Sequence, residues 1–134
     1  MRPFAPESRM YTLGGVFYPT GHMFLMFPTA EDALEAERLL LKAGYDGGSL
    51  CLLTPRDVHD KIWAGVEHED GLPSPGTEAE TARHFEELAR AGHHALLVPA
   101  PKAKDAERVM EALRGARISS AQRYRHFVIE DIVT

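Results

Sequence analysis

The 134-residue chain has a single cysteine and no long apolar run. One cysteine excludes an intramolecular disulfide. Cys51 lies in the apolar stretch 50–53, where we expect a buried, unreactive thiol. A membrane-spanning helix needs ~20 consecutive apolar residues, and neither such a stretch nor a secretory signal peptide is visible. The sequence therefore predicts a cytoplasmic protein without a membrane partner.

The chain also lacks the short motifs of well-known catalytic and cofactor sites. It has no glycine-rich phosphate loop, no Gly-x-Gly-x-x-Gly fingerprint and no Gly-x-Ser-x-Gly nucleophile elbow. Cys-x-x-Cys and His-Glu-x-x-His are absent as well. These absences favour a protein that is not an enzyme and that holds no cofactor.

Excess positive charge is missing too, because the formal net charge is −5. An acidic surface repels phosphate backbones and anionic lipid, so nucleic acid is not an expected partner. One segment departs from this pattern: Arg123, Tyr124, Arg125 and Phe127 combine basic and aromatic side chains. Such a mixture can stack on single-stranded nucleic acid, which defines a nucleic-acid-binding module as a minor alternative. A covered sheet edge or a subunit contact explains the same residues better.

What the chain does contain is an internal repeat. Residues 21–28 read GHMFLMFP and residues 92–99 read GHHALLVP. The triplet Ala-Glu-Arg at 36–38 recurs at 106–108. A strand–helix unit that occurs twice at nearly the same offset predicts two β-α-β halves around one sheet.

Local patterns predict the individual elements. Apolar runs too short for helices indicate strands at 23–27, 49–53 and 93–98, followed by a last strand and tail within 118–133. Apolar residues at helical spacing indicate helices between them. The predicted helix caps are Thr29, Thr54 and Thr77, and the predicted helix-ending glycines are Gly44, Gly92 and Gly115.

These elements predict one α+β domain over residues 1–134. Its expected parts are an N-terminal arm or hairpin (1–21), a first βαβ unit (22–54), a helical insertion (55–91), and a second βαβ unit with a tail (92–134). Duplicated βαβ units commonly form a ferredoxin-like plait, an antiparallel sheet backed by two helices. The insertion leaves an alternative open, a small flavodoxin-like parallel sheet with helices on both faces.

The chain is rich in histidine, with seven residues: His22, His59, His68, His84, His93, His94 and His126. Neutral imidazole binds transition metals, so these residues are candidate ligands. The best grouping is His59 with Glu67 and His68 under the insertion, with His93 as a further candidate. His22 and His93 could share a ligand in a parallel sheet but not in an antiparallel plait. Exposed or interfacial histidines remain the simpler interpretation, so no metal is expected.

Residues 26–58 (MFPTAEDALEAERLLLKAGYDGGSLCLLTPRDV) combine a strand, an alanine-rich helix, a Gly-aromatic-Asp turn and a strand that ends near Thr-Pro. This segment resembles the opening of small bacterial general-stress or heat-induced stress proteins. The ending RYRHFVIEDIV (123–133) is similar to the tails of uncharacterised bacterial proteins of comparable size. The resemblance implies an α/β fold and a stress-related role, and it transfers no catalytic residue.

The sequence therefore predicts a non-enzymatic ligand-binding or stress-related regulatory module that acts as a homo-oligomer. Apolar strand edges, which need to be covered, motivate the expected self-association. A small-molecule ligand is compatible with this reading. The main alternative is a metal-dependent enzyme or binder with its site under the insertion 55–91.

Overall fold

The computed structural model describes residues 2–3, 19–63, 77–125 and 128–133. Within them the protein has an α+β fold, built on one sheet with the strand order β1-β3-β4-β2-β5-β6. The strands are β1 (Arg2–Pro3), β2 (His22–Phe27), β3 (Cys51–Leu53), β4 (His94–Pro99), β5 (Ser120–Arg125) and β6 (Val128–Val133). The α-helices are α1 (Ala30–Lys42), α2 (Pro55–Asp57), α4 (Thr77–Arg90) and α5 (Ala103–Ala112). Helix α2 continues directly as the π-helix η3 (Val58–Trp63), and a short 3-10 turn, η2 (Gly47–Ser49), precedes β3.

The strands from β2 to β6 pair only in antiparallel fashion, while β1 runs parallel to β3. The parallel, flavodoxin-like alternative is therefore wrong. A single helix between β3 and β4 would return the chain to its starting end and make those strands parallel. The connection instead contains two helical segments, η3 and α4, which pack against each other. The chain goes out along one and back along the other, so β4 runs opposite to β3.

Short polar contacts confirm two of the predicted helix starts. The Thr29 hydroxyl accepts a hydrogen bond from the backbone N–H of Asp32 at 3.1 Å. Thr54 and Asp57 form a reciprocal capping box, with N–H to side-chain distances of 3.0 and 3.1 Å. Gly44 follows α1 with φ +102°, a conformation that favours glycine and ends the helix.

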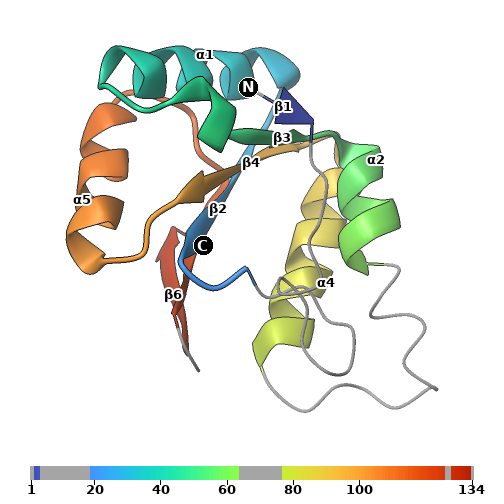
Figure 1. Ribbon diagram of the computed structural model, residues 1–134. Helices are drawn as coiled ribbons and strands as arrows, with labels where there is room; N and C mark the ends of the chain where they lie inside the picture. The colour runs from blue at the N-terminus through green and yellow to red at the C-terminus, as the bar shows by residue number, and fades with distance from the viewer. Residues whose placement is uncertain (1, 4–18, 64–76, 126–127, 134) are drawn as a thin grey trace.

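Helices cover both faces of the sheet (Figure 1). On one face, α1 and α5 enclose the first core cluster: Met23, Leu25, Phe27, Ala33, Ala36, Leu40, Leu50, Leu96, Val98, Ala100, Ala106, Val109, Leu113 and Ala121. On the other face, η3 and α4 enclose the second: Phe24, Met26, Cys51, Leu53, Val58, Ile62, Ala82, Phe85, Ala89, Ala95, Leu97 and Tyr124. The insertion 55–91 thus supplies a structural layer of its own. Cys51 is buried, as predicted.

The N-terminal part of the chain was not predicted in full. Arg2 and Pro3 pair with β3 and form one edge of the sheet, although no strand is predicted there from the sequence. Residues 4–18 of the predicted arm or hairpin and residues 64–76 of the predicted insertion lie outside what the structure describes. No helix in the described part of the chain combines the length and the apolar character needed to cross a membrane.

Candidate functional site

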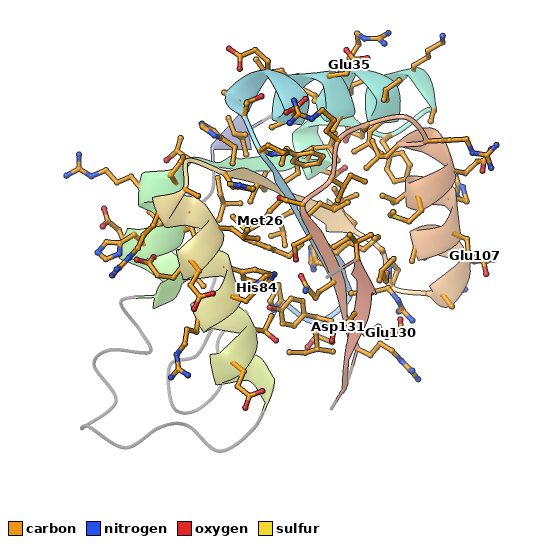
Figure 2. All side chains as sticks on the ribbon, turned by 180° about the vertical axis from the view of Figure 1, so that it is seen from behind. Met26, Glu35, His84, Glu107, Glu130 and Asp131 are labelled. Carbon is orange, nitrogen blue, oxygen red and sulfur yellow. The ribbon has the colours of Figure 1, made fainter. Side chains whose placement is uncertain are left out.

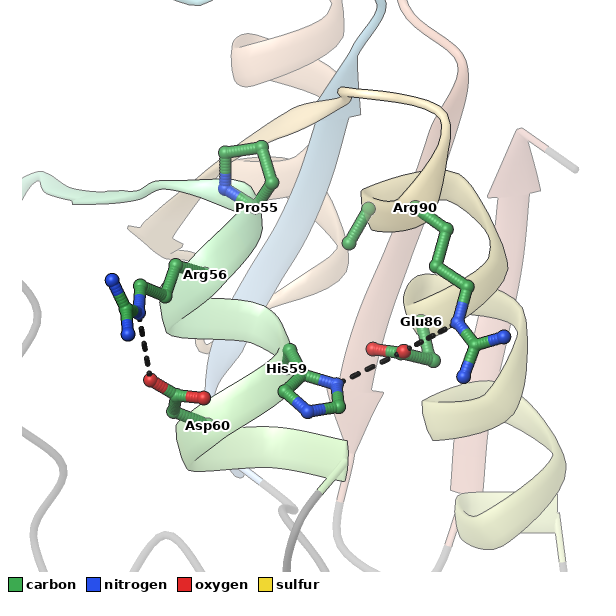
Figure 3. A pocket seen from close by; sticks show the side chains of 7 residues that line it. Pro55, Arg56, His59, Asp60, Glu86 and Arg90 are labelled. Carbon is green, nitrogen blue, oxygen red and sulfur yellow. Dashed lines mark hydrogen bonds and ion pairs between the residues drawn. The ribbon is translucent and has the colours of Figure 1, made fainter.

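Glu86 places a carboxylate inside the protein, between the two helices of the insertion. The residue is 3% exposed, and burying a charge is costly unless partners stabilise it. Its Oε1 accepts a hydrogen bond from Arg90 Nε at 2.9 Å and lies 3.0 Å from His59 Nδ1. Its Oε2 is buried and has no hydrogen-bond partner among the described residues. Figure 3 shows both contacts converging on one oxygen of Glu86.

The carboxylate borders a surface pocket of about 540 Å³. The pocket is lined by Pro55, Arg56, His59, Asp60, Glu86, Ala89 and Arg90. Its two acidic residues are both engaged, since Asp60 lies 3.5 Å from Arg56 Nε and Glu86 is bound as above. Arg90 uses only Nε in this contact, and no partner in the described part of the chain holds its terminal nitrogens. The pocket rim therefore offers mainly hydrogen-bond donors.

The contact with Glu86 also determines which nitrogen of the neutral His59 ring carries the proton. A carboxylate accepts hydrogen bonds, so the geometry assigns the proton of the neutral imidazole to Nδ1. Nε2 then carries the lone pair and can accept a proton or a ligand. His59 is about half exposed, whereas Glu86 is buried. The buried carboxylate therefore fixes the orientation of the imidazole at the wall of the pocket.

The structure brings together only part of the metal site suggested by the sequence. His59 lies in the pocket, but Glu67 and His68 fall outside the described residues. His93 belongs to a different environment, with Nδ1 2.8 Å from Ser119 Oγ, and burial lowers the pKa of its imidazole. Across residues 19–63, 77–125 and the two described end segments, no group of three or more His, Cys, Asp or Glu side chains is arranged to hold a metal ion.

The two repeat-related histidines cannot meet. His22 pairs with Pro99, while Phe27, at the far end of β2, pairs with His94. His93 therefore lies at the opposite end of the neighbouring strand from His22. Six residues of strand separate these ends, or ~20 Å.

The basic and aromatic residues of the nucleic-acid hypothesis are mostly inaccessible. Arg123 is buried, and its Nη2 lies 2.6 Å from Glu130 Oε1. Tyr124 is buried as well, and Phe127 lies outside the described residues. Tyr124 is buried because it belongs to the core cluster that η3 and α4 enclose, and Arg123 is held by Glu130 of the neighbouring strand β6. Of these residues, Arg125 is the one with a side chain described as exposed.

Sequence reasoning missed Glu86 and Arg90. The available signal was the position of Glu86 in α4, four residues after Ala82 and three before Ala89, both buried. A charged residue within an apolar helical stripe indicates a buried ionic contact.

No family model matches the chain, and neither a curated protein nor a solved structure gives a significant match.

Proposed function

We propose that the protein is a non-enzymatic ligand-binding module whose pocket takes a small anion bearing a carboxylate or phosphate group. The observation that carries this proposal is the state of Arg90. Buried Glu86 fixes its Nε, while no described residue occupies its terminal nitrogens beside Arg56 and His59. A guanidinium held in this way suits the paired oxygens of a carboxylate or phosphate. The stress-related role and the cytoplasmic location stay predictions from the sequence.

Titration calorimetry with inorganic phosphate and with acetate, at constant ionic strength, tests the pocket. Arg90→Gln should weaken binding by roughly 10- to 100-fold, because hydrogen bonds to charged groups contribute ~1.5–3 kcal/mol each. Arg56→Gln should weaken binding less, since its side chain is 89% exposed.

Arg114→Gln is the matched control, because Arg114 is also an exposed arginine paired with a nearby glutamate, Glu111, but lies just after α5. It removes the same charge far from the pocket and should leave the affinity unchanged. Equal losses in Arg90→Gln and Arg114→Gln would mean that only net charge matters. No heat of binding from either anion would overturn the proposal.

A second candidate, an enzyme or metal binder, uses the same pocket. The support is the His59–Glu86 contact at 3.0 Å, because a carboxylate on one ring nitrogen fixes the tautomer of the ring and orients the other nitrogen. Elemental analysis of protein purified without a histidine tag decides the metal version. A stoichiometric metal would favour it, and a metal-free protein would reject it.

The ferredoxin-like duplication is also part of the proposal. It is supported by the order β3-β4-β2-β5 of the central strands and by their antiparallel pairing. It is further supported by the two helices that follow β2 and β4, α1 and α5, which pack on the same face. In this reading β2-α1-β3 and β4-α5-β5 are the two halves, and η3 with α4 cover the face that a two-layer plait leaves open.

Self-association is proposed to occur through α1. Leu34 and Leu41 are 51% and 43% exposed and lie seven residues apart, so they share one face of the helix. The first half of that exposed face is acidic and the second half basic, with Glu31, Glu35, Arg38 and Lys42. In an antiparallel pair of α1 helices related by a two-fold axis, each Leu34 meets the Leu41 of a second copy, and opposite charges meet at both ends. The edge strand β6 is a poorer contact, because it carries Glu130 and Asp131.

Light scattering coupled to size-exclusion chromatography tests this contact. The wild-type chain should elute as a dimer, and the double variant Leu34→Glu with Leu41→Glu as a monomer of unchanged helix content. Ile132→Glu is the control, since Ile132 is a 36% exposed apolar residue on β6, and this variant should remain dimeric. A monomeric wild type, or a dimer that survives the double substitution, contradicts the α1 contact.

A further inference from the structure

A second polar pocket lies on the other side of α4, where this helix faces β5 and β6. It measures about 220 Å³ and is lined by Glu80, Thr81, His84, Gln122 and Asp131. Figure 2 shows His84 extending from α4 toward the strand that carries Asp131. These residues come from three elements that are distant in the sequence. The pocket shares no lining residue with the anion pocket.

One buried group in this pocket lacks a partner. His84 Nε2 is buried and has no hydrogen-bond partner among the described residues. Leaving such a group unpaired costs ~1–3 kcal/mol, so the fold alone does not account for it. Gln122 is 2% exposed, and its Oε1 accepts a hydrogen bond from Ser120 Oγ at 2.9 Å.

The charge of the pocket is negative. Neither Glu80 nor Asp131 forms an ion pair within the described part of the chain. An N–H donor bound in the pocket would select the neutral His84 tautomer with its proton on Nδ1, in which Nε2 is a third acceptor beside the two carboxylates. The described residues hold no arrangement suited to a metal ion. A group with one positive charge and several N–H donors matches this set better than a bare cation.

We propose that the pocket between α4 and the β5–β6 edge binds the primary ammonium group of a small organic amine. The three N–H donors of an ammonium match the Glu80 carboxylate, the Asp131 carboxylate and His84 Nε2. Gln122, held by Ser120, forms the buried floor of the pocket. The small volume admits the head group, and the alkyl chain extends into solvent. This site is independent of the anion pocket, because it uses different residues.

Calorimetric titration with 1,4-diaminobutane and with n-butylammonium chloride tests the site. Both amines should bind the wild type, and Asp131→Asn should weaken binding at least roughly tenfold, the effect of ~1.4 kcal/mol lost from a charged hydrogen bond. His84→Phe should weaken it as well, because the acceptor nitrogen is removed while the ring shape is kept. Asp131 is exposed, so its variant is expected to fold, which circular dichroism verifies.

Two controls separate this site from general attraction of cations. Asp60→Asn removes the same charge at the anion pocket and should leave amine binding unchanged. Tetramethylammonium has the charge without N–H donors and should bind much more weakly than n-butylammonium. Equal binding of the two cations, equal losses in both aspartate variants, or no binding of either amine would overturn the proposal. None of these results bears on the phosphate titration of the anion pocket, so the two proposals can fail independently.

Discussion

Replacing Phe85 by alanine should lower the free energy of unfolding by about 3–5 kcal/mol. Phe85 in α4 stacks on Phe24 in β2, with ring centroids 4.2 Å apart and planes at 27°. Both side chains are fully buried. The substitution removes a large apolar surface from the seam between insertion and sheet and leaves a cavity there. Urea denaturation followed by circular dichroism measures the loss.

The same experiment asks whether α4 is part of the core or a detachable cover. If α4 is a structural layer, far-ultraviolet and near-ultraviolet signals should change in one coincident transition, as in two-state unfolding. Glu87→Ala on the exposed face of α4 is the control and should change stability by less than ~0.5 kcal/mol. A loss below ~1 kcal/mol for Phe85→Ala, or a separate early transition, would contradict the layered core.

Replacing Glu130 by alanine should cost about 3–5 kcal/mol, because it leaves the buried Arg123 guanidinium without its counter-charge. The Arg123 side chain is 5% exposed, and its Nε and Nη2 lie 2.7 and 2.6 Å from Glu130 Oε1. The contact that remains, from Nη1 to the carbonyl oxygen of Pro101, is 3.4 Å long. Arg125, 3.8 Å from Glu130 Oε2, loses a partner as well. Chemical denaturation at neutral pH measures the effect.

A double-mutant cycle isolates the pair. Arg123→Met removes the buried charge and should rescue most of the stability lost in Glu130→Ala, since no unpaired ion remains. The exposed pair Glu35–Arg38 provides the control, because its Nη2–Oε1 distance is also 2.6 Å. Glu35→Ala should change the free energy of unfolding far less than Glu130→Ala, because solvent screens an exposed ion pair. Similar losses at Glu130 and Glu35 would show that the Arg123 pair is effectively solvated.

The local elements of this fold are predictable because their signals are local. Thr29 caps α1, and Thr54 with Asp57 caps α2, each through contacts within three residues. The apolar run 23–27 indicates a strand, and its lack of alternation has a physical cause: helices cover both faces of β2, so every residue in the run is buried. That same run does not reveal strand direction. Direction depends on the path of the insertion, which is a property of distant segments.

The candidate sites show the same difference between features that are local in the sequence and features that depend on packing. His59 is recognisable from its chemistry, but its partner Glu86 is 27 residues away and is found only when η3 and α4 pack. Arg123 and Tyr124 resemble a surface motif in the sequence, because the pattern does not show that η3 and α4 cover Tyr124 or that Glu130 pairs with Arg123. The sequence argument for self-association used strand edges, whereas the exposed leucines lie on α1. Side-chain type is visible in a sequence, and accessibility is decided by the packing of remote elements.

The position of β6 has a consequence for damage to the chain. Five of the six residues of β5 are buried in the intact protein. A protease that removed 128–133 would expose the backbone N–H and C=O groups of β5 along a new edge and would strip Arg123 of Glu130. A bare edge of this kind is a template for strands from other molecules. A clipped chain is therefore expected to aggregate, and the acidic pair Glu130 and Asp131 gives the intact edge its protection.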